Sequence, residues 1–147
     1  MNRAEATQKI LSAKKQKGLT FEALAATVGR HKVWTAAALL GQATMSKDEA
    51  QKAGAALGVE PDVVAALQEI PLKGSLAETV PVDPLIYRFH EITQVYGTTL
   101  KAIIHEMFGD GIMSAIDFEM DVQKKEDPKG DRVIVTMNGK FLQYKKW

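Results

Sequence analysis

The apolar pattern of this chain changes its period once, and that change constrains the fold more than any other feature. Up to about Ile70 apolar residues recur at helical spacing, whereas from Ile116 onward they alternate with polar ones. The two patterns are separated by PLKGSLAETVPVDP, residues 71–84, which carries three prolines and one glycine and has no sustained period. Helices first and strands last predict an α+β protein with a boundary in this stretch.

Start and stop signals divide residues 1–70 into five short helices. Asn2 with Glu5, and Ser46 with Glu49, have the spacing of capping boxes, and Pro61 suits a first helical turn. We therefore predict a compact five-helix bundle. Four glycines fall where helices are expected to end: Gly18, Gly29, Gly41 and Gly58.

Residues 85–147 predict a smaller α+β unit. Helices are expected over 85–96 and 99–108, closed by Gly97 and Gly109. Strands follow, with a turn at 127–130 and a second hairpin turn at Asn138–Gly139, so that an antiparallel sheet ends the chain. The expected organisation is a bundle over 1–70, a linker over 71–84, and a C-terminal domain over 85–147.

Composition excludes several classes of function. The 147 residues include 19 basic and 18 acidic ones and no cysteine, so neither a global charge for nucleic acid nor a thiolate site is available. The first residues, MNRAEATQKILSAKK, carry charges throughout, and we expect neither an export signal nor a membrane span. Because the net charge is close to zero, any site that binds an anion must depend on a few local cationic side chains.

The bundle carries a helix-turn-helix pattern that suggests a DNA-binding regulator. LTFEALAATVG resembles the first helix and turn of repressor domains. A recognition helix needs several base-reading side chains near its start. Here it reads HKVWTAAALLG, and only its His31 and Lys32, with Arg30 directly before it, are suited to a phosphate. A structural or assembly role for this bundle is favoured, and DNA binding remains the alternative.

Three polar residues of the C-terminal half are the candidates for chemistry. Arg88 and Glu91 lie together beside the apolar stripe of the helix expected over 85–96. Taken alone they are an ordinary ion pair at i, i+3, although an arginine at the margin of an apolar interface also holds anions well. Ser114 follows the turn Gly109-Asp110-Gly111, where a serine is usually a cap.

Other catalytic arrangements find no support in the sequence. Ser114 lacks the G-x-S-x-G surroundings of a hydrolase nucleophile. His31, His90 and His105 show no metal-ligand spacing, and the last two lie off the apolar stripes. A C-terminal domain this small, without disulfides, predicts that copies of the chain share a core.

The block YRFHEITQVYGTTLKAIIHEMFGDGIMSAIDF resembles the catalytic domain of the cyanase (cyanate hydratase) family, and the resemblance extends over most of the chain. The family pattern matches Arg88, Glu91 and Ser114 as catalytic residues. The resemblance implies a cytoplasmic lyase that acts on cyanate and bicarbonate without metal or organic cofactor. It also implies a homodecamer, a pentamer of dimers with intertwined C-terminal domains, and no role for nucleic acid or membrane.

The chemistry of two anionic substrates agrees with an oligomeric site. Holding two anions about 4 Å apart costs about 4 kcal/mol at an effective dielectric near 20, which cations must offset. The block has one arginine, so Arg88 from two chains would meet this need better than one. Two alternatives stay open: a DNA-binding regulator with an oligomerisation domain, and an inert assembly protein.

Overall fold

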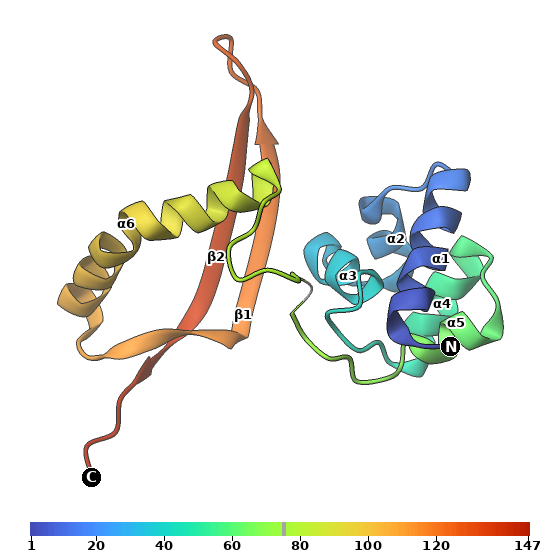
Figure 1. Ribbon diagram of the computed structural model, residues 1–147, viewed down its shortest axis with the longest axis horizontal. Coiled ribbons are helices and arrows are strands. Elements are labelled where there is room, and N and C mark those ends of the chain that lie inside the picture. Colours follow the sequence, from blue (N-terminus) through green and yellow to red (C-terminus); the bar gives the residue numbers. More distant parts are fainter. Residues whose placement is uncertain (75) are drawn as a thin grey trace. The chain divides into compact units, whose positions relative to one another are not determined.

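The computed structural model describes residues 1–74 and 76–147 (Figure 1). It divides into two compact units, one holding the N-terminal helices with Asp121–Ile134, the other holding Leu76–Met120 with Val135–Trp147. The six helices and two strands of these described residues confirm the α+β class. In chain order they are α1 Arg3–Gln16, α2 Phe21–Val28, α3 Lys32–Leu39, α4 Lys47–Leu57, α5 Pro61–Ala66, α6 Pro84–Phe108, β1 Gly111–Lys125 and β2 Arg132–Gln143.

The bundle α1–α5 forms where its capping signals predict. Both capping boxes are present, from Asn2 to Glu5 and from Ser46 to Glu49, and Pro61 is the first residue of α5. Gly29 and Gly58 end α2 and α4 with left-handed backbone, which glycine adopts without the steric cost of a Cβ. The helix ends of this half are therefore fixed by local sequence.

The bundle encloses a continuous apolar core. One side of each helix supplies it, and its largest fully buried apolar side chains are Ile10, Leu24, Leu39, Met45, Leu57, Val63 and Leu67. Burying a side chain of this size stabilises a fold by about 1.5–3 kcal/mol. This half of the chain thus has a core of its own.

Two charged side chains join helices around that core. The guanidinium of Arg3 donates to the carbonyls of Ala38, Ala43 and Ala66, so it ties the start of α1 to the ends of α3 and α5. Burial lowers the pKa of Arg3. Glu49 accepts from the Ser46 amide at 2.7 Å and from Arg30 Nε at 2.5 Å.

The helices expected over 85–96 and 99–108 are one helix, α6, so that part of the prediction is wrong. Gly97 lies inside α6 without left-handed backbone, because the apolar spacing from Tyr96 to Leu100 continues in register across it. A glycine inside a helix costs only about 1 kcal/mol relative to alanine. One residue of low helix propensity is therefore not enough to end a helix whose pattern runs on.

The second hairpin, expected at Asn138–Gly139, is also wrong. The strand β2 runs through both residues, and the sheet has two strands, β1 and β2 (Figure 1). The turn expected at 127–130 is confirmed: the Gly130 amide donates to the Asp127 carbonyl at 2.9 Å, and the Asp127 side chain accepts from the Lys129 amide at 2.8 Å. Asn-Gly favours a turn, but cross-strand pairing along β2 prevails here.

The C-terminal half buries very little of itself. The helix α6 spans 25 residues and none of them is buried. Large apolar side chains are exposed on α6 and on β1, including Leu85 at 69%, Met107 at 70% and Ile116 at 99% exposure. Of the described residues after 75, only Pro81, Gly111 and Ser114 are buried. The described part of this half thus forms no apolar core within one chain.

Glu49 makes the stability of the bundle depend on pH. The Ser46 amide and, to a smaller extent, Arg30 hold the pKa of Glu49 below its ordinary value of 4.5, although burial acts in the opposite direction. A lowered folded-state pKa means that the stabilisation is present above the unfolded pKa and is lost as the pH falls through the folded one. Glu49→Gln should cost about 1–3 kcal/mol at pH 7 and less at pH 3, measured by urea unfolding.

Asp48→Asn is the matched control, because Asp48 is an exposed neighbour that pairs with Lys52 on the helix surface. Its effect should stay within about 0.5 kcal/mol at both pH values. An equal loss for Glu49→Gln at pH 7 and pH 3 would contradict the assignment.

Candidate functional site

Arg88 and Glu91 meet on the first turns of α6. The N-terminus of this helix is fixed by Asp83, whose carboxylate accepts from the Leu85 and Ile86 amides at 2.9 Å each, and by Pro84 in the first turn. One helical turn further on, Arg88 Nη1 donates to Glu91 Oε2. The expected neighbourhood of these two side chains is therefore present.

This ion pair leaves the arginine able to bind a further group. A guanidinium has five N–H donors, and the pair with Glu91 engages Nη1. The Arg88 side chain is 63% exposed in the single chain, so the Arg88–Glu91 ion pair contributes little to the free energy of unfolding. Glu91 holds the guanidinium in one orientation, as a site for an anion requires.

Ser114 lies near the start of β1 and is one of the few buried residues of this half, at 4% exposure. Its Oγ accepts from the Ile116 amide at 3.0 Å and from the Asp117 amide at 2.9 Å. Figure 1 shows β1 changing direction shortly after its start. The hydroxyl thus acts as a local cap, as expected of a serine after a glycine turn.

Those two contacts limit what the Ser114 hydroxyl can still do. A serine hydroxyl has one hydrogen to donate and two lone pairs with which to accept. Because two amides occupy the lone pairs, the O–H hydrogen is what remains for a ligand. Ser114 is therefore arranged to donate a hydrogen bond to an oxygen or nitrogen lone pair.

His105 makes a contact beside the candidate site that the sequence pattern did not reveal. Its Nε2 lies 3.2 Å from the carbonyl oxygen of Gly111 and bridges the last turn of α6 to the first residue of β1. A carbonyl can only accept, so Nε2 carries the hydrogen in this contact. Spacing along the helix placed His105 off the apolar stripe but gave no signal for this bond.

Ser114 and the Arg88–Glu91 pair lie on different elements. Arg88 and Glu91 are on α6 and bond to each other, whereas the Ser114 hydroxyl, on β1, accepts from the Ile116 and Asp117 amides. Among the described residues, no hydrogen bond or ion pair joins the serine to either of the other two.

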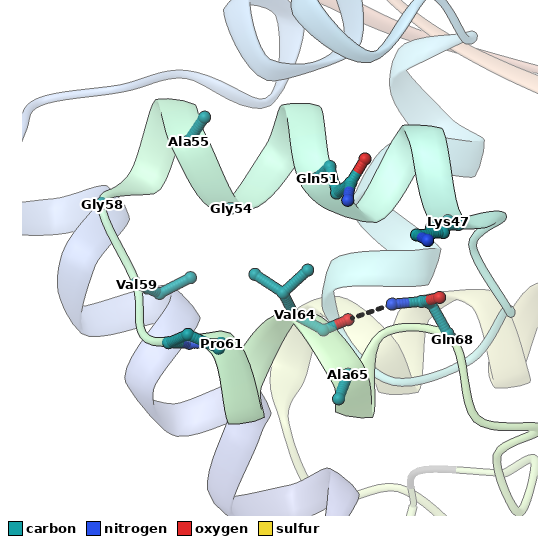
Figure 2. A pocket seen from close by; sticks show the side chains of 10 residues that line it. All are labelled: Lys47, Gln51, Gly54, Ala55, Gly58, Val59, Pro61, Val64, Ala65 and Gln68. Atoms are coloured by element: carbon teal, nitrogen blue, oxygen red, sulfur yellow. Dashed lines mark hydrogen bonds between the residues drawn. The ribbon is translucent and has the colours of Figure 1, made fainter.

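A groove lies between α4 and α5 in the bundle, but its chemistry is poor (Figure 2). It has a volume of about 490 Å³ and is open to solvent, and Lys47 is the only charged residue among those that line it. Gly54 faces Val64 across it, and Gln68 donates to the Val64 carbonyl (Figure 2). Volume alone does not make this groove a catalytic site.

The helix-turn-helix segment offers little to DNA. Arg30 is engaged by Glu49 and also lies 5.7 Å from the ring of Trp34. On α3, Thr35, Ala38 and Leu39 are buried, so much of the supposed recognition helix belongs to the core. These contacts disfavour the DNA-binding alternative.

Within 1–74 and 76–147, no helix joins sufficient length to the apolar character needed to cross a membrane. Across the same residues, no group of three or more His, Cys, Asp or Glu side chains is arranged to hold a metal ion.

Family models match both halves of the chain. The model for the N-terminal domain of cyanate hydratase matches residues 3–71, and the model for the cyanate lyase C-terminal domain matches residues 78–146. The chain belongs to the cyanate lyase family. The second match contains Arg88, Glu91 and Ser114.

Individual relatives agree along nearly the whole length. Cyanate hydratase of Synechococcus sp. (strain CC9311) is 60% identical over 141 residues, 96% of this chain and 94% of that protein. Cyanate hydratase of Dechloromonas aromatica (strain RCB) is 55% identical over all of both chains. The crystal structure of cyanase from T. urticae superposes with a TM-score of 0.84 at 43% identity, covering 94% of this chain and 96% of that one.

The hydrogen bonds of Ser114 can be tested without any substrate. Ser114→Ala leaves the Ile116 and Asp117 amides without their acceptor, so their hydrogen exchange should accelerate about tenfold, the scale of one lost hydrogen bond. Ser114→Thr keeps a hydroxyl and should preserve slow exchange. Equal exchange in the alanine and threonine variants would refute the assignment.

Proposed function

We propose that this chain is a cyanate hydratase, a lyase that decomposes cyanate in a reaction that depends on bicarbonate. Membership of the cyanate lyase family over both halves carries the proposal. The products are carbamate and carbon dioxide, and carbamate then yields ammonia and more carbon dioxide. Cyanate catabolism of this kind removes a toxic anion and releases usable nitrogen.

Each candidate residue has a role that suits its contacts. Arg88 binds and polarises the anions through the donors that Glu91 leaves available. Glu91 orients Arg88, or handles a proton during the reaction. Ser114 donates a hydrogen bond to a substrate atom, because its lone pairs already accept from two amides.

The first stage converts cyanate and bicarbonate into carbamate and carbon dioxide, and it consumes one proton. A bicarbonate oxygen attacks the carbon of cyanate, and a new C–O bond forms while the nitrogen takes up a proton. The adduct then breaks the bond between the former bicarbonate carbon and the transferred oxygen, releasing carbon dioxide and leaving carbamate once the second hydrogen has moved from bicarbonate to nitrogen. A further proton converts carbamate into ammonia and carbon dioxide.

The catalytic task is to hold two anions together. Their repulsion at about 4 Å, about 4 kcal/mol at an effective dielectric near 20, must be offset by fixed cations and donors. Positioning supplies the rest of the rate acceleration, since well-oriented reactants avoid most of the entropic cost of coming together. This chemistry uses groups of the chain, and we propose that neither a metal nor an organic cofactor takes part.

A site between copies of the chain supports this task better than a site within one. Among the described residues no hydrogen bond joins Arg88 to Ser114, and the apolar residues of α6 and the hairpin are exposed in the single chain. A second copy would cover that surface and bring a second Arg88. We propose an oligomer with shared sites, a homodecamer built as a pentamer of dimers, acting in the cytoplasm.

The activity is tested by ammonia release from cyanate with and without bicarbonate. Turnover should require bicarbonate, and Arg88→Ala should lower kcat/KM by at least about 100-fold, the scale of a lost oxyanion donor. Arg88→Lys keeps the charge without the planar fork and should retain part of the activity.

Arg132→Ala is the matched control, because Arg132 is an exposed arginine outside the candidate site, near Asp127 at the hairpin turn. It should leave turnover within about twofold of the unaltered protein. Cyanate decomposition at an equal rate without bicarbonate would overturn the proposed reaction.

Shared sites predict complementation between inactive variants. Arg88→Ala and Ser114→Ala chains are each expected to keep only a small residual activity, but their co-assembly places an intact Arg88 beside an intact Ser114 from another copy. Co-expressed and purified as mixed oligomers, the two variants should recover a measurable share of the original activity. A mixture as inactive as its components would contradict a site that combines these residues from two copies.

A further inference from the structure

The dipeptide Asn138–Gly139 is the sequence signal that the fold did not use as a turn. Gly139 lies inside β2, and it is not one of the described glycines with positive φ. The backbone conformation at Gly139 is therefore one that residues with a side chain also adopt. The reason for a glycine here must be steric rather than conformational.

The steric reason lies on the facing strand. A Cβ on Gly139 would lie 2.4 Å from the carbonyl oxygen of Ser114 and 2.5 Å from Cγ of Met113. Contacts below 3.0 Å are essentially never seen for real Cβ atoms, so something would have to shift. The Met113 side chain can rotate away, whereas the Ser114 carbonyl belongs to the backbone of β1.

We propose that Gly139 is a positioning residue for Ser114: because β2 has no side chain at this point, Ser114 keeps the position in which its hydroxyl accepts from two amides. The inference rests on the proposed function for its effect on catalysis. Its effect on the geometry of Ser114 stands on the contacts alone.

A Cβ at Gly139 would act directly on the residue that carries the hydroxyl. The carbonyl that a Cβ would displace belongs to the same residue as the Oγ that accepts from Ile116 and Asp117. Moving that carbonyl turns the peptide between residues 114 and 115 and shifts Oγ relative to the two amides. A misplacement of about 1 Å at a reacting group can lower a rate by about 100-fold.

Gly111 provides an informative contrast at the neighbouring step of the hairpin. A Cβ there would lie 2.3 Å from the Leu142 carbonyl and 2.5 Å from the ring of Phe141. Gly111 therefore allows the strands to approach without touching Ser114. At both glycines an added Cβ would overlap with the facing strand, but only at Gly139 would it overlap with Ser114.

Gly139→Ala is the primary test. We expect kcat to fall by about 100-fold with KM changed less than threefold, and hydrogen exchange at Ile116 and Asp117 to accelerate. Gly97→Ala is the matched control for the exchange measurement, because a Cβ there meets nothing nearer than Thr93 Cγ2 at 3.7 Å within the chain, and it should leave exchange at Ile116 and Asp117 unchanged. Unchanged exchange at both amides in Gly139→Ala overturns the proposal.

A double-variant cycle separates positioning from general damage to the fold. If Gly139 acts through Ser114, Gly139→Ala combined with Ser114→Ala should be no slower than Ser114→Ala alone, within about threefold. A purely structural role predicts that the two losses multiply. Multiplied losses would therefore reject the positioning role.

A gentler pair of variants covers the case in which Gly139→Ala does not fold. Met113→Ala removes the side-chain overlap, so comparing Met113→Ala/Gly139→Ala with Met113→Ala isolates the overlap with the Ser114 carbonyl. The double variant should show faster exchange at Ile116 and Asp117, and equal exchange rejects the proposal. If the unaltered protein leaves cyanate intact, the proposed function fails, while the exchange comparison still decides the role of Gly139.

Discussion

The structure depends on the unequal distribution of apolar burial between its two halves. The bundle α1–α5 encloses a core, whereas α6 spans 25 residues without burying one of them. A helix is stabilised in water mainly by packing of its apolar face, and α6 has little such packing within its own chain. The same helix carries the Arg88–Glu91 pair. Assembly and catalysis are therefore proposed for one surface, and the chemistry depends on whatever covers that helix.

Local sequence predicted the parts of the fold that local interactions determine. The capping boxes at Asn2 and Ser46 and the turn at 127–130 formed as expected, because each depends on residues within three or four positions. The two errors have a common cause. Gly97 and Asn138–Gly139 carry local signals for interruption, but a continuing apolar stripe and cross-strand pairing outweigh them. Such cooperative effects cannot be evaluated from a dipeptide.

The candidate site was predictable to different degrees. Helical spacing placed Arg88 beside Glu91, and the ion pair is present. The turn before Ser114 suggested a cap, yet neither its two amide donors nor the facing Gly139 could be predicted, because both depend on how β1 bends and pairs. The same holds for the contact of His105 with the Gly111 carbonyl. The catalytic roles came from family resemblance, since the residues alone suggest an ion pair and a capping serine.

The two amides that occupy the lone pairs of Ser114 have a consequence for ligand selectivity. A hydroxyl that can only donate discriminates between ligands by the direction of their hydrogen bonds. In the site proposed above, anions that present lone pairs to Ser114 would gain a partner, whereas a ligand of the same size that presents an N–H or O–H would find no acceptor and would lose its hydration without replacement. The bend in β1 would thus act as a filter against protonated analogues, independently of their charge.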